Sequence, residues 1–212
     1  MINTIVDIFH QNAIDFDRVK AAGIVAIIHK ATEGSRFKDS EYQNRRAHAK
    51  ELGFLWGAYH FASGEDVTDQ VDNFLSHAQP KDDELVALDF EPSSSGPNMT
   101  LEQAHQFVQL VQNELGRFPV VYGGRLLRDT LGLQRDDLLA KCPLWYARYS
   151  GTDTPIGIPP QIWPTFTLWQ YTDGNRGSVP HSVDGIGRCD RNRFSGTEDD
   201  LRNAWPLTKA AA

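Results

Sequence analysis

The sequence is poor in cysteine and lacks long apolar runs, and both shortages exclude classes of protein. Only Cys142 and Cys189 occur in 212 residues. A small fold stapled by several disulfides is therefore excluded, whereas one bridge between these two residues stays open. No apolar segment is long enough to span a membrane, so we expect no membrane insertion.

Positive charge is also scarce. The chain holds 21 Lys and Arg against 28 Asp and Glu, which gives a formal net charge of −7. No basic stripe is present, so nucleic acid is not an expected partner. The first residues, Met1-Ile2-Asn3-Thr4, contain neither a basic segment nor a long apolar one. We therefore expect no signal peptide in this chain.

Sequence patterns for metal and phosphate binding are missing too. The seven histidines show no ligand spacing such as His-Glu-x-x-His, so we expect no metal site. Gly123-Gly124 follows a predicted strand, but the third glycine and the lysine of a phosphate-binding loop are absent. We predict that the protein works without a cofactor.

What the chain does contain is an alternation of strand and helix patterns, which is typical of parallel βα units. Apolar runs rich in β-branched and aromatic residues predict eight strands. Their ranges are 2–8, 24–31, 55–61, 85–91, 120–124, 144–149, 167–172 and 187–192. Asp15 can cap one intervening helix, and two capping boxes, Ser40 with Gln43 and Thr100 with Gln103, predict the starts of two others.

Eight strands in one chain predict a closed barrel. Prolines 155, 159, 160 and 164 forbid a helix between the sixth and seventh strands, and no helical period separates the seventh from the eighth. The predicted fold is therefore α/β, a TIM-like barrel with five βα units followed by three strands, (β/α)5(β)3. We expect one domain over residues 1–212, with a frayed tail at 206–212.

Two acids end the fourth predicted strand, in Leu88-Asp89-Phe90-Glu91. Because side chains alternate along a strand, Asp89 and Glu91 point the same way, roughly 6–7 Å apart at the backbone. Neighbouring buried carboxylates repel each other, which raises one pKa and lets one group stay protonated near neutral pH. Such a pair is what a glycosidase needs. The alternative is that both acids extend into solvent from a frayed strand end.

Functional residues of such barrels lie at the carboxyl ends of the strands. This rule gathers two further acids, Asp7 and Asp190, beside Asp89 and Glu91 as catalytic candidates. Aromatic rings can stack on sugars, and polar groups can bind hydroxyls. Candidate substrate-binding residues are Tyr59, His60, Phe61, Tyr122, Trp145, Tyr146, Trp169, Gln170 and Glu33. Since side chains alternate, about half of these aromatic residues could instead pack against the helices.

Several short segments, in their order and spacing, resemble those of one enzyme family. They are Val6-Asp7-Ile8, Lys30-Ala31-Thr32-Glu33-Gly34, Gly57-Ala58-Tyr59-His60-Phe61, Leu88-Asp89-Phe90-Glu91, Leu144-Trp145-Tyr146-Ala147, Leu168-Trp169-Gln170-Tyr171 and Cys189-Asp190-Arg191-Asn192-Arg193-Phe194. The chain resembles the lysozymes of glycoside hydrolase family 25. The resemblance implies the same five-plus-three barrel and a muramidase that cuts the β-1,4 bond between N-acetylmuramic acid and N-acetylglucosamine.

The resemblance also implies roles for the four acids. Glu91 matches the general acid, and Asp89 matches the carboxylate that assists the substrate's acetamido group. Asp7 and Asp190 match supporting acids. Asp184 competes with Asp190 for the last position, but only Asp190 is followed by asparagine and phenylalanine at the family spacing.

One residue departs from the family pattern, because Phe9 stands where the family often has serine or tyrosine. The shared strand face of Asp89 and Glu91 suits neither direct displacement by a carboxylate nor inversion. It suits attack by the substrate's own acetamido oxygen, so we expect retention of configuration.

We expect the protein to be a monomer and to bind the glycan strands of peptidoglycan. We expect it to reach the cell wall by secretion or by release during lysis. Two alternatives stay open. A chitinase-like hydrolase of N-acetylglucosamine polymers would also have Asp-x-Glu on its fourth strand. A non-catalytic wall-binding barrel is disfavoured, because such a module would usually have lost one of the acids.

Overall fold

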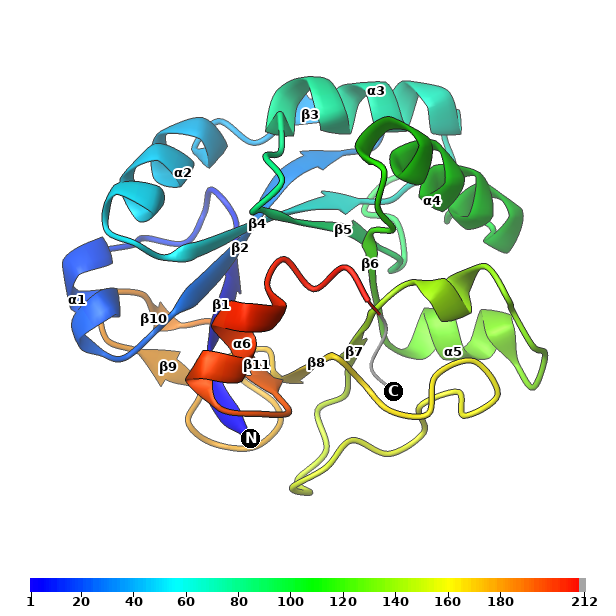
Figure 1. Cartoon of the computed structure of the whole chain (residues 1–212). Helices are drawn as coiled ribbons and strands as arrows, with labels where there is room; N and C mark the ends of the chain where they lie inside the picture. Colours follow the sequence, from blue (N-terminus) through cyan, green and yellow to red (C-terminus); the bar gives the residue numbers. More distant parts are fainter. Residues whose placement is uncertain (210–212) are drawn as a thin grey trace.

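The computed structural model describes residues 1–209, and within them eight strands close into a barrel (Figure 1). In order around the barrel they are β1 (Ile2–Ile8), β2 (Ala26–Glu33), β4 (Leu55–Phe61), β5 (Leu85–Asp89), β6 (Val120–Gly123), β7 (Leu144–Ala147), β8 (Leu168–Thr172) and β11 (Asp190–Phe194). Neighbouring strands are parallel except that β11 is antiparallel to both β1 and β8. The predicted barrel is confirmed, as a mixed rather than an all-parallel one.

Three short strands lie outside the barrel. Strand β3 (Phe37–Lys38) folds back on the end of β2, and β9 (Ser182–Val183) pairs with β10 (Gly187–Arg188) in a small hairpin. The strand predicted at 187–192 is therefore two strands, which are separated at Cys189.

Five helices follow the first five barrel strands, as the five-plus-three arrangement predicts. They are α1 (Phe16–Ala21), α2 (Tyr42–Glu51), α3 (Val67–Ala78), α4 (Leu101–Leu115) and α5 (Arg125–Leu131), and a 3-10 turn, η1 (Leu139–Lys141), precedes β7. Within residues 148–167, all of them described, no helix joins β7 to β8.

Two of the three predicted helix N-caps are present in the structure, and one is not. Thr100 and Gln103 form the expected capping box of α4, and Asp15 caps α1. The capping box predicted at Ser40 is wrong. Helix α2 begins one residue later than that box requires, and the buried Asp39 carboxylate instead accepts the Glu41 N–H at 3.0 Å.

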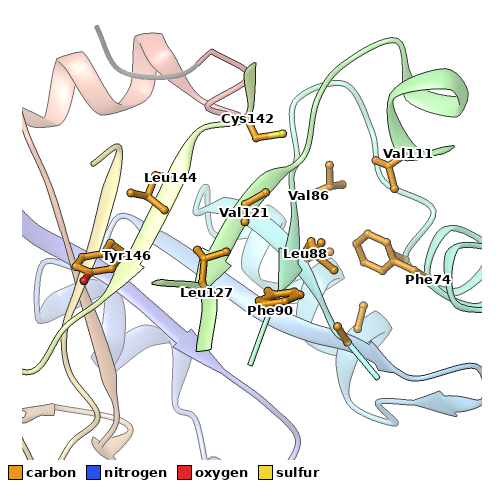
Figure 2. Close-up of a cluster of buried hydrophobic side chains, with 14 of the residues drawn as sticks. Phe74, Val86, Leu88, Phe90, Val111, Val121, Leu127, Cys142, Leu144 and Tyr146 are labelled. Atoms are coloured by element: carbon orange, nitrogen blue, oxygen red, sulfur yellow. The ribbon is translucent and has the colours of Figure 1, made fainter. Parts of the chain in front are cut away.

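Side-chain alternation divides the core into two layers. One layer packs the outside of the barrel against the helices, and Figure 2 shows Leu88 and Phe90 of the β5 segment in it with Leu144 and Tyr146 of β7. The other layer fills the barrel interior, where Trp145 is buried. Successive residues of β7 thus belong to different layers, as the pleat of a strand requires.

A sixth helix, α6 (Glu198–Ala204), follows β11 and was not expected from the sequence. The last residue of β11, Phe194, pairs with Ile2 at the start of β1, so α6 lies at the end of the barrel where the parallel strands begin. Leu201 and Leu207 belong to the interior core cluster, and Leu207 is only 3% exposed. Leu207 is therefore buried, although it belongs to the tail that we expect to fray from residue 206; residues 210–212 lie outside the described part.

The structure also answers the question of a disulfide. Cys142 and Cys189 are both buried and both free thiols. Over residues 1–209, no helix is both long and apolar enough to cross a membrane. In the same part of the chain, no three His, Cys, Asp or Glu side chains lie together as a metal site would need.

Candidate active site

The four candidate acids meet at the end of the barrel where the parallel strands finish. Asp7 lies near the end of β1, and Asp89 is the last residue of β5. Asp190 is the first residue of β11, and the antiparallel direction of that strand brings it opposite Asp7 in the β1–β11 register. Asp190 therefore lies at the same end of the barrel as the other three acids, although it stands at the amino end of its own strand.

A pocket of about 230 Å³ opens at this end of the barrel. Its lining includes all four acids and five of the nine candidate substrate-binding residues. The lining residues are Asp7, Phe9, Lys30, Tyr59, Phe61, Asp89, Glu91, Tyr122, Trp145, Tyr149, Gln170 and Asp190. Tyr59, Trp145 and Tyr122 form a continuous aromatic wall, with ring centroids 6.4 Å and 4.5 Å apart.

Three aromatic candidates point to the other face of their strands and do not line the pocket. His60 is fully buried against Phe107, with ring centroids 5.2 Å apart. Tyr146 lies in the outer core layer (Figure 2), where its hydroxyl donates to the Gly157 carbonyl at 2.8 Å. Trp169 is also in that layer, and its Nε1–H donates to the Arg148 carbonyl at 2.8 Å. Each of these residues follows or precedes a pocket residue by one position, so the pleat turns it outward.

Glu33 is near the pocket but does not line it. Its carboxylate is held by the Lys30 ammonium group and by the Ser94 hydroxyl. Burial alone would raise the pKa of Glu33, but these two donors outweigh it and lower that pKa below its usual value. A carboxylate stabilised in this way is a poor proton donor.

Three pocket residues were not among the candidates: Phe9, Lys30 and Tyr149. Phe9 stands two positions after Asp7, so strand periodicity alone could have placed it on the same face. Lys30 extends toward two aromatic rings, and its Nζ lies 4.6 Å from the Phe61 centroid. Among residues 1–209, it is the single cationic residue in the pocket lining.

A network of amides and ring donors holds Asp7. Gln170 Nε2 donates to both Asp7 oxygens, at 3.0 and 3.1 Å, and Asn192 Nδ2 donates to Oδ2 at 2.7 Å. The oxygen of each amide also accepts a hydrogen bond. Tyr122 donates to Gln170 Oε1 at 2.8 Å, and Trp145 Nε1 donates to Asn192 Oδ1 at 2.6 Å. Each amide is thus oriented with its NH2 group toward Asp7, which favours the ionised carboxylate.

Burial and crowding raise the pKa of every acid in the pocket. Burial raises the pKa of Asp7 to about 6, although the Asn192 and Gln170 hydrogen bonds hold it down. Burial and then the charge of Asp7 raise the pKa of Asp190 to about 8. Because the Asn192 and Gln170 amides donate to Asp7, the structure favours ionisation of Asp7 before that of Asp190.

Asp89 and Glu91 form a second crowded pair. Burial raises the pKa of both, and the charge of Glu91 raises that of Asp89 further, while the Lys30 ammonium group opposes the rise. Asp89 Oδ1 is buried and has no hydrogen-bond partner among residues 1–209. A buried carboxylate oxygen without a donor is costly, so this atom is available to accept a hydrogen bond from a bound molecule.

Comparison with known proteins decides the family. Residues 6–180 match the sequence profile of glycosyl hydrolases family 25. The chain belongs to this family. Lysozyme M1 of Streptomyces globisporus is 30% identical over 207 residues, covering 91% of this chain and 67% of that protein. The N,O-diacetylmuramidase of Arthroderma benhamiae is 27% identical over 179 residues, covering 79% of this chain and 75% of that protein.

Solved structures of family 25 agree with the barrel described above. The bacterial lysozyme of Streptomyces coelicolor superposes with a TM-score of 0.82 at 29% identity over 96% of both chains. The family GH25 lysozyme of Aspergillus fumigatus has a TM-score of 0.78 at 28% identity, covering 96% of this chain and 97% of that one. This family 25 protein is thus a glycoside hydrolase of the lysozyme type that acts on the cell-wall polymer peptidoglycan.

Proposed function

We propose that this family 25 enzyme hydrolyses the β-1,4 bond between N-acetylmuramic acid and N-acetylglucosamine, with retention of configuration. The observation that supports this most is the acid cluster itself. A crowded Asp89–Glu91 pair shares one pocket with a tightly held Asp7, and an aromatic wall faces them. Related proteins named lysozyme and N,O-diacetylmuramidase support the choice of bond.

Glu91 is the proposed general acid. It is the less buried member of the Asp89–Glu91 pair, and it stands two residues beyond the end of the buried strand, where it can reach a glycosidic oxygen. Burial and the charge of Asp7 raise its pKa. A carboxyl group with a raised pKa keeps its proton near neutral pH and can deliver it to the leaving oxygen.

Asp89 is the proposed acceptor for the substrate's acetamido N–H. Its unpartnered Oδ1 needs a donor, and an N–H group aligned there would stabilise the ionised form of Asp89 and lower its pKa. The shared proton of the pair would then remain on Glu91. Substrate binding thus assigns the acid role to Glu91, even though Asp89 is the more deeply buried group in the empty pocket.

In this mechanism the acetamido oxygen attacks the anomeric carbon while Glu91 protonates the leaving oxygen. Water then opens the cyclic intermediate, with Glu91 now acting as base. Two displacements at one carbon preserve configuration, and substrate assistance of this kind is a known exception to the two-carboxylate scheme. Ionised Asp7, held by Gln170 and Asn192, stabilises the positive charge that develops at the sugar ring.

The chitinase-like alternative differs in the sugar at the new reducing end, and that difference provides the test. Purified peptidoglycan is digested, and the new reducing-end sugars are reduced with borohydride. The products are then separated, and their masses are measured by mass spectrometry. We expect reduced N-acetylmuramic acid. Reduced N-acetylglucosamine, or release of soluble sugar from chitin at a similar rate, would contradict the proposal. A chain that binds peptidoglycan but releases no ends would support a non-catalytic barrel.

A further inference from the structure

The cut glycan is a long polymer, whereas the pocket of about 230 Å³ is small. The strand must therefore leave the pocket over neighbouring surface. On the side of β1 and β3, that surface carries three rings, Phe9, His10 and Phe37, which we call the aromatic shelf. Only Phe9 among them lines the pocket, and Phe37 is 40% exposed.

The rings of the shelf are close enough to form one surface. The Phe9 and His10 centroids are 5.3 Å apart with an interplanar angle of 86°, and the His10 and Phe37 centroids are 5.8 Å apart at 45°. Lys30 connects the shelf to the pocket, because its Nζ lies 5.4 Å from the centroid of Phe37 and 4.6 Å from that of Phe61. The shelf is thus continuous with the pocket wall.

The shelf is also held rigidly, although it stands on loops and on a two-residue strand. His10 donates its backbone N–H to Asp39 Oδ2 at 2.9 Å, and its ring Nδ1 lies 3.0 Å from the same oxygen of this fully buried residue. The side chain of Asn73 donates to the carbonyl groups of Gly34 and Phe37, at 2.9 and 3.1 Å, and so fixes the β2–β3 turn. A rigid platform loses little conformational entropy when a ligand binds.

We propose that the aromatic shelf is an outer sugar subsite, in which Phe37 stacks on the ring of an amino sugar that is not itself being cut. A pyranose ring has an apolar face of C–H groups, and an exposed aromatic ring beside the cleft is the surface that such a face buries best. Its continuity with the pocket makes the same glycan strand the occupant. This inference rests on the proposed function, since it assumes that a glycan occupies the pocket.

The test is a chain-length series of peptide-free glycan strands, prepared with an amidase, from four sugars upward. For the wild type we expect KM to fall as the strand becomes long enough to reach the shelf. Phe37→Ala should raise KM on the longer strands by about three- to tenfold and leave kcat unchanged, because ring stacking has an energy of that order. Phe37→Tyr should restore the wild-type KM.

Two controls keep the result interpretable. Leu133→Ala removes an apolar side chain that is 92% exposed and does not line the pocket, and it should leave the KM series unchanged. Phe37→Leu keeps an apolar side chain without a flat ring. It replaces Phe37→Ala in the test if the melting temperature of Phe37→Ala is lower than that of the wild type. It should show the same rise in KM.

The outcomes separate this inference from the proposed function. If Phe37→Ala and Phe37→Leu follow the wild-type KM series while the wild type releases muramic acid ends, the shelf is not a sugar subsite. An effect confined to strands that still bear peptides would assign the shelf to peptide recognition and would also overturn the inference. If the wild type releases other ends, the proposed function fails, whatever the variants show.

Discussion

Asp190 offers a quantitative test of the electrostatics of this site, because this half-buried acid stands opposite Asp7 in the β1–β11 pairing. The two residues are register partners on β1 and β11, and both lie in the pocket. Ionising the second of two neighbouring buried acids is unfavourable. Asp190→Asn keeps the size of the side chain and removes the titration. We therefore expect the variant to be more stable than the wild type at high pH.

The magnitude follows from the pKa of the folded state. Folding raises the pKa of Asp190 from 3.8 to about 8. The stability from a protonated carboxyl group is fully present below the unfolded pKa and is lost as the pH rises toward the folded pKa. One pH unit corresponds to about 1.4 kcal/mol, so a single group loses about 4 kcal/mol between pH 5 and pH 8. Because Asp7 shares the repulsion, we expect Asp190→Asn to gain about 2–4 kcal/mol over that interval.

The assay is urea unfolding of both proteins at pH 5, 6, 7 and 8. The difference in the free energy of unfolding, variant minus wild type, should increase steadily with pH. Asp17→Asn, on exposed α1 surface, is the matched control and should show no such trend. A difference that is flat with pH, or one that falls, would refute the view that Asp190 is held protonated by burial and by Asp7.

Further outcomes are expected for Asp7, for the Asp89–Glu91 pair and for the two cysteines. Gln170→Leu removes the two hydrogen bonds that Gln170 Nε2 donates to Asp7, and this loss raises the pKa of Asp7. The acidic limb of the kcat/KM profile should therefore move to higher pH. A limb that does not move would show that ionisation of Asp7 does not control catalysis. Asp89→Asn should lose less activity than Glu91→Gln, and proton NMR of a fresh digest should show the β-anomer first, whereas an initial α-anomer would mean inversion. Burial raises the pKa of both cysteines to about 12, so a thiol reagent should label Cys142 and Cys189 only after unfolding, and a reductant should leave the melting temperature unchanged.

Strand periodicity explains why some of the predicted substrate-binding residues line the pocket and others do not. Tyr59 and Phe61 face the pocket, so His60 between them faces the helices. Trp145 faces the interior, and Tyr146 after it is therefore in the outer layer. Choosing one parity for each strand would have separated these residues, but only three-dimensional register shows which parity is inward.

Other features had weaker signals in the sequence. The pairing of β2 with β4 is irregular between Lys30 and Thr32, so the parity of Glu33 could not be counted along the strand. The reversed direction of β11 depends on the loop that contains β9 and β10, and this loop shows no helical period. Helix α6 is only seven residues long, which is too short for a periodic pattern to be distinguished from a loop. The one signal for its start was the capping box of Thr197 and Asp200, which the sequence prediction missed.

Glu91 is proposed to deliver the proton to the leaving oxygen, and the turnover of Glu91→Gln tests this claim. The amide nearly keeps the shape of the side chain but cannot act as the acid. We expect kcat on purified peptidoglycan to fall by about 10²–10⁴-fold, while the melting temperature and glycan binding stay close to those of the wild type. A folded variant that keeps more than about a tenth of the wild-type kcat, where acid catalysis predicts at most about a hundredth, would contradict the claim and move the acid role to another carboxyl group of the pocket.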